Sequence, residues 1–342
     1  MNRKTIILFL LFIPVICFSQ KKPADSLREK EPEYDTSYIT TYPDDLMFGL
    51  FGSNYYSNFS LHDNVKNQTV TYAPNSNFNL GFNTSWRWLG LSMAFDFRFM
   101  NHDEDVYGES YKFDLSSTWF FRKYMLDAGI QYNRGFYMKN APTLFAPWTA
   151  GTSYPQYDDM HTFNMGISAC YVVNYPKYSL RASFSQSEIM KKSSGSWLAN
   201  IYYNLFATAA YQGIVPDTIK PLFDKNSYIY TAWVSNLGAG IGYAHTFVKD
   251  KWYFTFALVP GLSVQKYQAQ GDSIFFLKSN LSLRMQSRFS FGYNADRWYY
   301  GISTFKESYA FQSTASSSLA YKNGYVRLFV GRRFKVKGKK IL

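Results

Sequence analysis

The chain has 342 residues, a formal net charge of +12, an aromatic content of 20% and a charged content of only 18%. Few charges and many aromatic side chains are unusual for a domain surrounded by water and are typical of a surface that meets lipid. Beyond the N-terminus no run of about 18 apolar residues occurs, which excludes membrane-spanning helices and leaves a closed β-barrel as the structure that could cross a bilayer.

Residues 1–20 have the pattern of a cleaved signal peptide. A basic start precedes an apolar core from Ile6 to Cys17 and a small residue at Ser19. A lipoprotein anchor at Cys17 is the alternative, although the residue before this cysteine is bulky. Removal of the signal leaves Cys170 without an intramolecular disulfide partner. We expect an exported chain that does not meet nucleic acid.

Three further segments follow the signal. Residues 21–44 are polar, contain prolines and lack periodicity, so we expect a flexible periplasmic lead-in. Residues 45–334 repeatedly alternate apolar and polar side chains, and we expect them to form one barrel domain. Residues 335–342 form a basic tail after Phe334, where the last strand is expected to end.

The clearest alternation lies in residues 77–99, where two adjacent segments alternate apolar residues with Asn, Ser, Gly, Asp and Arg. Because successive side chains of a strand point to opposite faces, this pattern predicts a β-hairpin with one apolar and one polar surface. Similar segments predict further strands at residues 45–60, 111–121, 124–133, 163–173, 178–184, 197–206, 230–247, 252–266, 276–294, 298–307 and 324–334.

The connections predict a single antiparallel transmembrane β-barrel of about 12 strands, with 14 as the alternative. Short turns mostly alternate with longer polar loops, which is the layout of short periplasmic turns and longer extracellular loops in outer-membrane barrels. Strand counts from the two ends disagree by one crossing. Either residues 187–196 fold into the lumen without reversing the chain, or residues 207–227 contain another strand.

A soluble barrel or a β-sandwich would also show alternation. The composition of the polar faces separates these possibilities, because a sheet exposed to water usually carries Lys and Glu. Here those faces carry mainly Asn, Ser, Gly, Thr and Gln, with a few Arg and Asp. This composition favours a confined, hydrated lumen and therefore an all-β barrel with lipid outside.

Charged residues on the faces assigned to the lumen form the main candidate site. Buried charges must pair or touch water, so they could form a structural network that plugs the barrel. Alternatively, an excess of arginine could line a narrow path that favours anions. The residues in this set are Arg87, Asp96, Arg98, Lys112, Asp114, Asp127, Arg181, Arg284 and Arg288.

A second candidate is the basic Gly/Ser segment that contains Lys191, Lys192, Ser193 and Gly195. Backbone amides in such a segment can hold an anion, and lysine beside serine can act as a base and a nucleophile. An ordinary basic turn is the alternative. We expect lumenal folding or anion contact here in preference to catalysis.

An enzymatic function is not favoured by the sequence. Lipid-active barrels use a Ser-His-acid set, but none of His62, His102, His161 and His245 stands in a nucleophile motif. Acidic residues at 103–105 and 158–159 could hold calcium, although their spacing matches no defined loop and solvated loop tips are the simpler interpretation. We expect no catalytic residue, no metal site and no cofactor.

Three blocks of sequence resemble a known family. They are residues 107–115 with 131–140, residues 174–184 with 191–196, and residues 238–243. Together they resemble the domain of unknown function 4421 family, exported β-rich proteins of Gram-negative bacteria. The resemblance implies an outer-membrane barrel over about residues 45–334 and implies no catalytic residues, since the family has no assigned activity.

The sequence therefore predicts an outer-membrane β-barrel, most simply a narrow channel or permeation barrel with an arginine-rich polar lumen. A lipid-modifying enzyme and a structural or assembly barrel are the alternatives. Expected partners are outer-membrane lipids and lipopolysaccharide, together with small anionic solutes. Periplasmic partners and the oligomeric state are left open.

Overall fold

The structure is a computed structural model. It describes residues 33–42, 44–75, 78–86, 89–96, 103–145, 147–149, 151–271, 275–312 and 316–335. The chain divides into two units, Met1–Pro32 and Glu33–Leu342, and all that follows concerns the second unit. The expected signal peptide, most of the lead-in and residues 336–342 of the basic tail lie outside the described residues.

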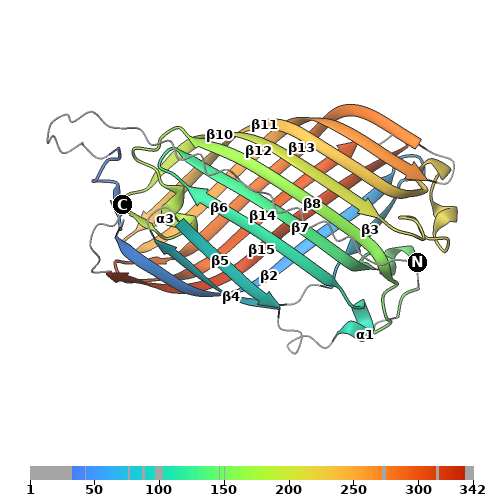
Figure 1. The fold of residues 1–342 in the computed structure, drawn as a ribbon, viewed down its shortest axis with the longest axis horizontal. Coiled ribbons are helices and arrows are strands. Elements are labelled where there is room, and N and C mark those ends of the chain that lie inside the picture. Colours follow the sequence, from blue (N-terminus) through green and yellow to red (C-terminus); the bar gives the residue numbers. More distant parts are fainter. Residues whose placement is uncertain are drawn as a thin grey trace, which may run out of the picture. The chain divides into compact units, whose positions relative to one another are not determined.

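The described residues are mostly β-strands, which wind around an elongated barrel (Figure 1). In chain order the strands are β1 (Ile39–Thr41), β2 (Asp45–Asp63), β3 (Gln68–Ala73), β4 (Phe78–Trp86), β5 (Leu89–Asp96), β6 (Tyr111–Phe120), β7 (Tyr124–Met138), β8 (Gln156–Val172), β9 (Glu188–Met190), β10 (Ser194–Ala209), β11 (Ile229–Lys249), β12 (Trp252–Gly271), β13 (Phe275–Asn294), β14 (Trp298–Gln312) and β15 (Ser317–Lys335). The helical elements are α1 (Glu104–Tyr107), α2 (Ala141–Leu144), α3 (Leu180–Phe184), η2 (Lys220–Leu222) and η3 (Lys225–Ser227). None of the helices in these described segments has the length and apolar character that a membrane crossing requires.

The sheet closes where β15 pairs antiparallel with β2, from Lys335 opposite Asp45 to Ser317 opposite Asp63. The closed ring contains ten strands, in the order β2, β3, β7, β8, β10, β11, β12, β13, β14 and β15. Strands β4 and β5 extend from β2, and β6 extends from β7, which makes thirteen strands in the sheet. The closed all-β barrel is confirmed, whereas the expected count of twelve stays a prediction.

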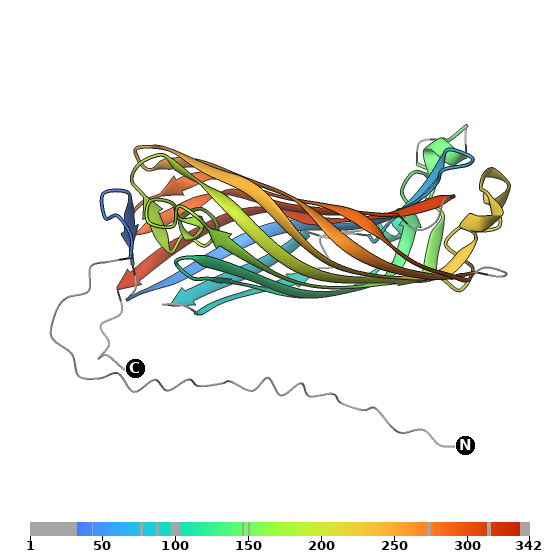
Figure 2. The same cartoon turned by 90° about the horizontal axis from the view of Figure 1, so that it is seen from above.

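The two ends of the barrel differ. Short turns around Lys123, Asp250 and Asp296 lie at one end with β1, β9 and α3, and we name this the turn end. The opposite end carries α1, α2, η2 and η3, and we name it the loop end (Figures 1 and 2). The expected separation of short turns from longer loops holds only in part, because the longest connection, residues 173–193, lies at the turn end and the connections 64–67, 272–274 and 313–316 at the loop end are short.

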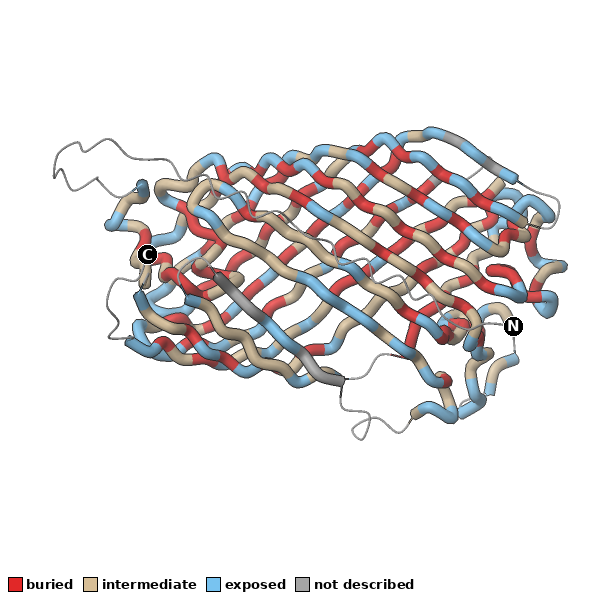
Figure 3. The backbone as a smooth tube through the Cα atoms, in the orientation of Figure 1, coloured by how far each residue is buried: buried red, intermediate tan, exposed pale blue. Residues whose placement is uncertain are grey.

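Along the turn-end half of the barrel, the wall is apolar outside and polar inside. On β13, Phe289 and Phe291 are 39% and 48% exposed, while Arg288 and Ser290 beside them are buried. Figure 3 shows this alternation of buried and exposed residues along many strands. A protein in water buries its apolar residues, so this surface is suited to lipid.

On β2, β14 and β15, the polarity of the wall is reversed along the loop-end half, whereas β11 to β13 keep exposed apolar residues such as Leu237 and Leu277 there. Phe59 and Leu61 of β2 point inward and are fully buried, whereas Asn58 and Ser60 lie on the outer face. Their inward neighbours include Leu319 on the adjacent β15. On this side of the barrel, the loop-end section therefore encloses an apolar core and presents polar residues outward.

One expected strand is wrong. Residues 180–184 form the short helix α3, whose first turn is capped by Ser179, which accepts a hydrogen bond from Ala182 N at 3.3 Å. The apolar side chains of this short stretch matched a period of two, but they are buried as a helix inside the mouth of the barrel.

The two strand counts disagreed because of this segment. Strand β8 ends at the turn end and β10 returns from it, so residues 187–196 do not reverse an extra strand. Residues 207–227 contain the end of β10 and the two 3-10 helices, and they hold no additional strand in the described structure. The first of the two sequence-based alternatives is thus confirmed.

The polarity of the wall gives a direct stability prediction. Ile241→Arg places a charge on the outer face of β11, where Ile241 is 69% exposed. If this face meets the middle of a bilayer, unfolding from lipid vesicles should become easier by about 2–4 kcal/mol. Denaturant titration of the reconstituted protein measures the change.

Ser235→Arg is the matched control, since Ser235 lies on the same outer face of β11, six residues nearer the loop end. That distance is roughly 20 Å along the strand, so the cost should fall to about 0–1 kcal/mol. Equal costs for the two variants would contradict the position assigned to lipid.

Candidate functional site: the interior of the barrel

The middle of β13 places Arg284 inside the barrel, where only 4% of this residue is exposed. Its Nε donates to Glu307 Oε1 at 2.8 Å, and its Nη1 donates to Asn200 Oδ1 at 2.7 Å. The guanidinium also lies over the ring of Tyr202, 4.2 Å from the centroid. Because an isolated buried charge is costly, these contacts are what allow Arg284 to stay inside. Arg284 is therefore part of the packed interior.

Arg288 forms a second ion pair four residues farther along β13. Its Nη2 donates to Asp127 Oδ2 at 2.8 Å, and Asp127 also accepts a hydrogen bond from Thr118 Oγ1 at 2.6 Å. Asp127 belongs to β7, whereas Arg288 belongs to β13, and four strands of the ring separate them. This ion pair therefore crosses the interior and ties distant parts of the wall together.

Lys112 and Asp114 lie on the inner face of β6, as expected. Lys112 is in register with Asn133 of β7, and Asp114 is in register with Gln131. The carboxylate of Asp114 accepts a hydrogen bond from Gln131 Nε2 at 2.8 Å. Asp114 thus extends the polar network toward the edge of the sheet formed by β6.

Three residues of the expected lumenal set cannot be placed in this network. Arg87 and Arg98 lie outside the described residues. Asp96 ends β5 opposite Asn79, but its side chain is not among those described.

The mouth at the turn end is filled by residues 174–193, which we name the turn-end plug. At its centre the carboxylate of Glu188 is almost fully buried and accepts a hydrogen bond from Ser179 Oγ. Arg122 approaches Glu188 to 3.0 Å from the β6–β7 turn, and Arg181 approaches it to 3.4 Å from α3. Burial lowers the pKa of the Arg181 guanidinium from its ordinary value, while the charge of Glu188 acts in the opposite direction.

Two further contacts fasten the turn-end plug to the rest of the chain. Strand β9 of the plug pairs with β1, so the end of the lead-in lies against it. Arg333 of the last strand donates to the carbonyl oxygen of Gln186 and, at 2.6 Å, to Asn294 Oδ1. The plug is therefore held by both ends of the described chain.

Lys191, Lys192, Ser193 and Gly195 lie at the rim of the turn end. Lys191 Nζ donates to the carbonyl oxygen of Thr36 at 2.8 Å, and Lys192 Nζ lies 5.1 Å from the ring centroid of Tyr38. Ser193 Oγ accepts a hydrogen bond from Val248 N at 2.8 Å. Gly195 is in register with His245 on the wall. These residues join the lead-in and the wall, and an anion contact stays a prediction.

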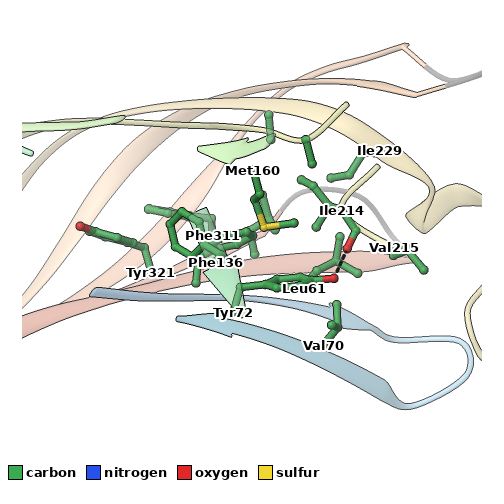
Figure 4. Packing of buried hydrophobic residues seen from close by; sticks show 14 of the residues in the cluster. Leu61, Val70, Tyr72, Phe136, Met160, Ile214, Val215, Ile229, Phe311 and Tyr321 are labelled. Carbon is green, nitrogen blue, oxygen red and sulfur yellow. Dashed lines mark hydrogen bonds between the residues drawn. The ribbon is translucent and has the colours of Figure 1, made fainter. Parts of the chain in front are cut away.

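The loop end is filled by an apolar cluster, which Figure 4 shows between the wall and the segment 210–228. Tyr72 OH donates to the carbonyl oxygen of Ile214 at 2.7 Å and so anchors this segment inside. Asp63 holds it further out, because Asp63 Oδ2 accepts hydrogen bonds from Asp224 N and from Ser227 Oγ. We name the cluster the loop-end core; its fully buried members include Phe59, Leu61, Val70, Tyr72, Met138, Met160, Phe206, Ile214 and Ile219.

The histidines do not form a catalytic arrangement in the described structure. His62 forms a hydrogen bond with Thr69, His161 with the carbonyl oxygen of Asp159, and His245 with Tyr243. His245 packs on the outer face of β11 against the rings of Phe247 and Phe256. His102 lies outside the described residues. Within those residues, no three His, Cys, Asp or Glu side chains gather as metal ligands.

Sequence reasoning missed several residues that hold the interior together, above all Glu307, Glu188 and Arg333. A signal for Glu307 was present, because it is the only acidic residue in β13, β14 and β15 and it alternates with Phe305 and Tyr309. No comparable signal marked Glu188, although folding of the stretch 187–196 that contains it into the lumen, without a reversal of the chain, was one of two expected alternatives. Arg333 was assigned no role beyond the final strand.

These features define a class of protein: a closed β-barrel with an outer surface suited to lipid and an interior filled by polar and apolar side chains. Within this class, the chain belongs to the family described as Domain of unknown function (DUF4421), whose sequence model matches residues 33–334. The resemblance seen in the sequence is thus confirmed. No curated protein matches the chain.

Several solved barrels are similar to this chain at low identity. They include the outer membrane protease OmpT from Escherichia coli, at 6% identity and a TM-score of 0.38, covering 86% of this chain and 98% of that one. The translocator domain of the autotransporter NalP from Neisseria meningitidis has 8% identity and a TM-score of 0.33, covering 84% and 88%. The Pseudomonas putida toluene transporter TodX has 7% identity and a TM-score of 0.25, covering 86% and 90%. These likenesses carry no conclusion about activity.

The buried ion pair in the middle of the barrel predicts a large effect on stability. Glu307→Leu leaves Arg284 buried without its carboxylate, so the free energy of unfolding should fall by about 3–5 kcal/mol. Denaturant titration of the protein in detergent micelles measures this loss.

The double variant Arg284→Met/Glu307→Leu is the control, because it removes both charges together. We expect it to be clearly more stable than Glu307→Leu alone. If the two variants lose the same stability, the pairing is not what holds Arg284 inside.

Proposed function

We propose that the protein is an outer-membrane barrel that is sealed along its length and acts as a structural or assembly protein. The loop-end core is the observation that carries this proposal. Its aromatic side chains come from strands around the ring, as where Phe206 of β10 lies 4.6 Å from Tyr321 of β15 between ring centroids. Rings packed across the interior leave no open path for a solute.

Two more layers support a sealed interior. The network around Arg284 and Arg288 occupies the middle, with each guanidinium paired to a carboxylate. The turn-end plug occupies the mouth beneath it. A lumen that is filled at three levels is better suited to anchoring the chain in a membrane than to free diffusion.

The proposal includes a wall of twelve crossings. Strand β2 pairs with β3 through residues 59–63 and with β4 through residues 47–54, so β3 and β4 serve as two parts of one crossing. Together with β5 and β6 this arrangement supports twelve crossings, an even number as in bacterial single-chain barrels. The turn end then faces the periplasm and the loop end faces the exterior.

A gated path for small anions is the second candidate. It is favoured by one observation: the turn-end plug is a separate segment inside the wall, fastened largely through the charge of Glu188. Displacing the plug would expose the arginines above it. This candidate requires the loop-end core to open as well.

Planar-bilayer recordings of the purified protein test the proposal. We expect no conductance steps above a protein-free control for the wild type. Glu188→Gln weakens the two ion pairs of the plug, yet it should also give no steps, because the loop-end core still fills the barrel. Glu33→Gln removes a charge from the exposed ion pair with Lys123 and is the matched control at the same end.

The outcomes separate the two candidates. Steps from the wild type would overturn the sealed barrel outright. Steps from Glu188→Gln, but not from Glu33→Gln, would replace it with the gated path.

A further inference from the structure

Charged residues on the outer face of the barrel wall are all of one sign along six consecutive strands. No acidic residue occurs among the outward-facing side chains described on β10 to β15. The acidic residue of these strands, Glu307, points inward. The outward basic residues are Lys249, Lys266, Lys306, Lys322 and Arg332. A surface that meets only solvent would mix both signs, so this bias indicates an anionic partner at the wall.

Two of these lysines lie together on the loop-end side of the apolar surface. Lys306 of β14 is in register with Gly324 of β15, and Lys322 of β15 is in register with Ser308 of β14. The lysines are therefore diagonal neighbours on one face, with Cα atoms roughly 7–8 Å apart. Both side chains are exposed, and neither forms an ion pair among the described residues.

Strand β2 adds neutral donors beside the two lysines. Asn58 is in register with Lys322, and Tyr56 is in register with Gly324. A Cβ atom on Gly324 would lie 2.6 Å from the Tyr56 hydroxyl, so the absence of a side chain there lets the phenol lie across β15. We name this surface the lysine patch; it consists of Tyr56, Asn58, Lys306, Ser308 and Lys322.

Apolar side chains border the lysine patch toward the turn end. Ile302, Leu328 and Val326 are 37%, 59% and 44% exposed on the same outer face of β14 and β15. A lipid standing beside the wall would place its acyl chains on these residues and its headgroup on the patch. Ammonium, hydroxyl and amide groups are all hydrogen-bond donors that suit phosphate oxygens.

We propose that the lysine patch binds a phosphate of the glycolipid in the outer leaflet of the outer membrane. The choice of glycolipid follows from the patch lying on the loop-end side of the apolar surface, and it rests on the membrane and orientation proposed above. The two ammonium groups supply charge, while Tyr56, Asn58 and Ser308 supply directional hydrogen bonds.

Binding of purified lipid A to the full-length protein in detergent tests this assignment. Native mass spectrometry gives the bound fraction for the wild type, for Lys306→Gln/Lys322→Gln, and for Lys249→Gln/Lys266→Gln. The last variant removes the same charge from the same outer face but outside the patch. We expect roughly thirty-fold weaker binding for the patch variant, on the scale of about 1 kcal/mol per lysine near a membrane surface.

Each result has a defined meaning. Dephosphorylated lipid A should bind all three proteins equally weakly. Unchanged lipid A binding by the patch variant, or an equal loss in the Lys249/Lys266 variant, would overturn the site. Tighter binding of phosphatidylglycerol than of lipid A would overturn the choice of glycolipid. None of these measurements depends on conductance, so the site and the sealed barrel can fail independently.

Discussion

The ion pair between Arg288 and Asp127 joins two walls of the barrel through its interior, and much of the architecture depends on it. On both strands the adjacent residues belong to the outer face, which is suited to lipid. Neither charge could therefore move to that face without losing its partner in an apolar environment. A shift of one residue in the register of β13 would expel Arg284 and Arg288 together. Pairing across the interior therefore fixes the register of β13 relative to β7 and the side of the wall that each residue occupies.

The reversal of polarity along β2, β14 and β15 suits this part of the sheet to two environments. Near the turn end β2 and β15 bury polar groups and expose leucine, as at Ser53 and Leu328. Near the loop end the same strands bury Phe59 and Leu319 and turn their polar residues outward. Where lipid surrounds the wall, apolar side chains can face outward, and the hydrophobic effect does not drive them into the lumen. Where water surrounds the wall, the hydrophobic effect favours burying them inside. In the proposed orientation these strands extend beyond the membrane into water, which accounts for the loop-end core, and the lysine patch lies where the two polarities meet.

The faces of the wall could be predicted from the sequence because a strand has a fixed period of two, and Arg284, Arg288, Asp127 and Asp114 all point inward as the alternation indicated. The helix of the turn-end plug could not be predicted from the sequence. Tyr178–Phe184 alternates by chance, and the stretch is too short for periodicity to separate a strand from a helix. The ion-pair partners of the arginines were equally hidden. Glu307 and Glu188 meet them only once strands distant in the sequence are brought together, which periodicity alone does not describe.

The reversal of polarity is tested most directly by spin labels placed one at a time along β15 in reconstituted protein. Labels at Val326, Leu328 and Val330 should collide with lipid-soluble oxygen, while labels at Ser318 and Ala320 should collide with a water-soluble nickel chelate. Labels at Leu319 and Tyr321, which are 1% exposed, should be shielded from both reagents. Oxygen contact that continues unchanged to Ser318, or free access of the chelate to Leu319 and Tyr321, would contradict a barrel with lipid at one half and a sealed apolar core in the other.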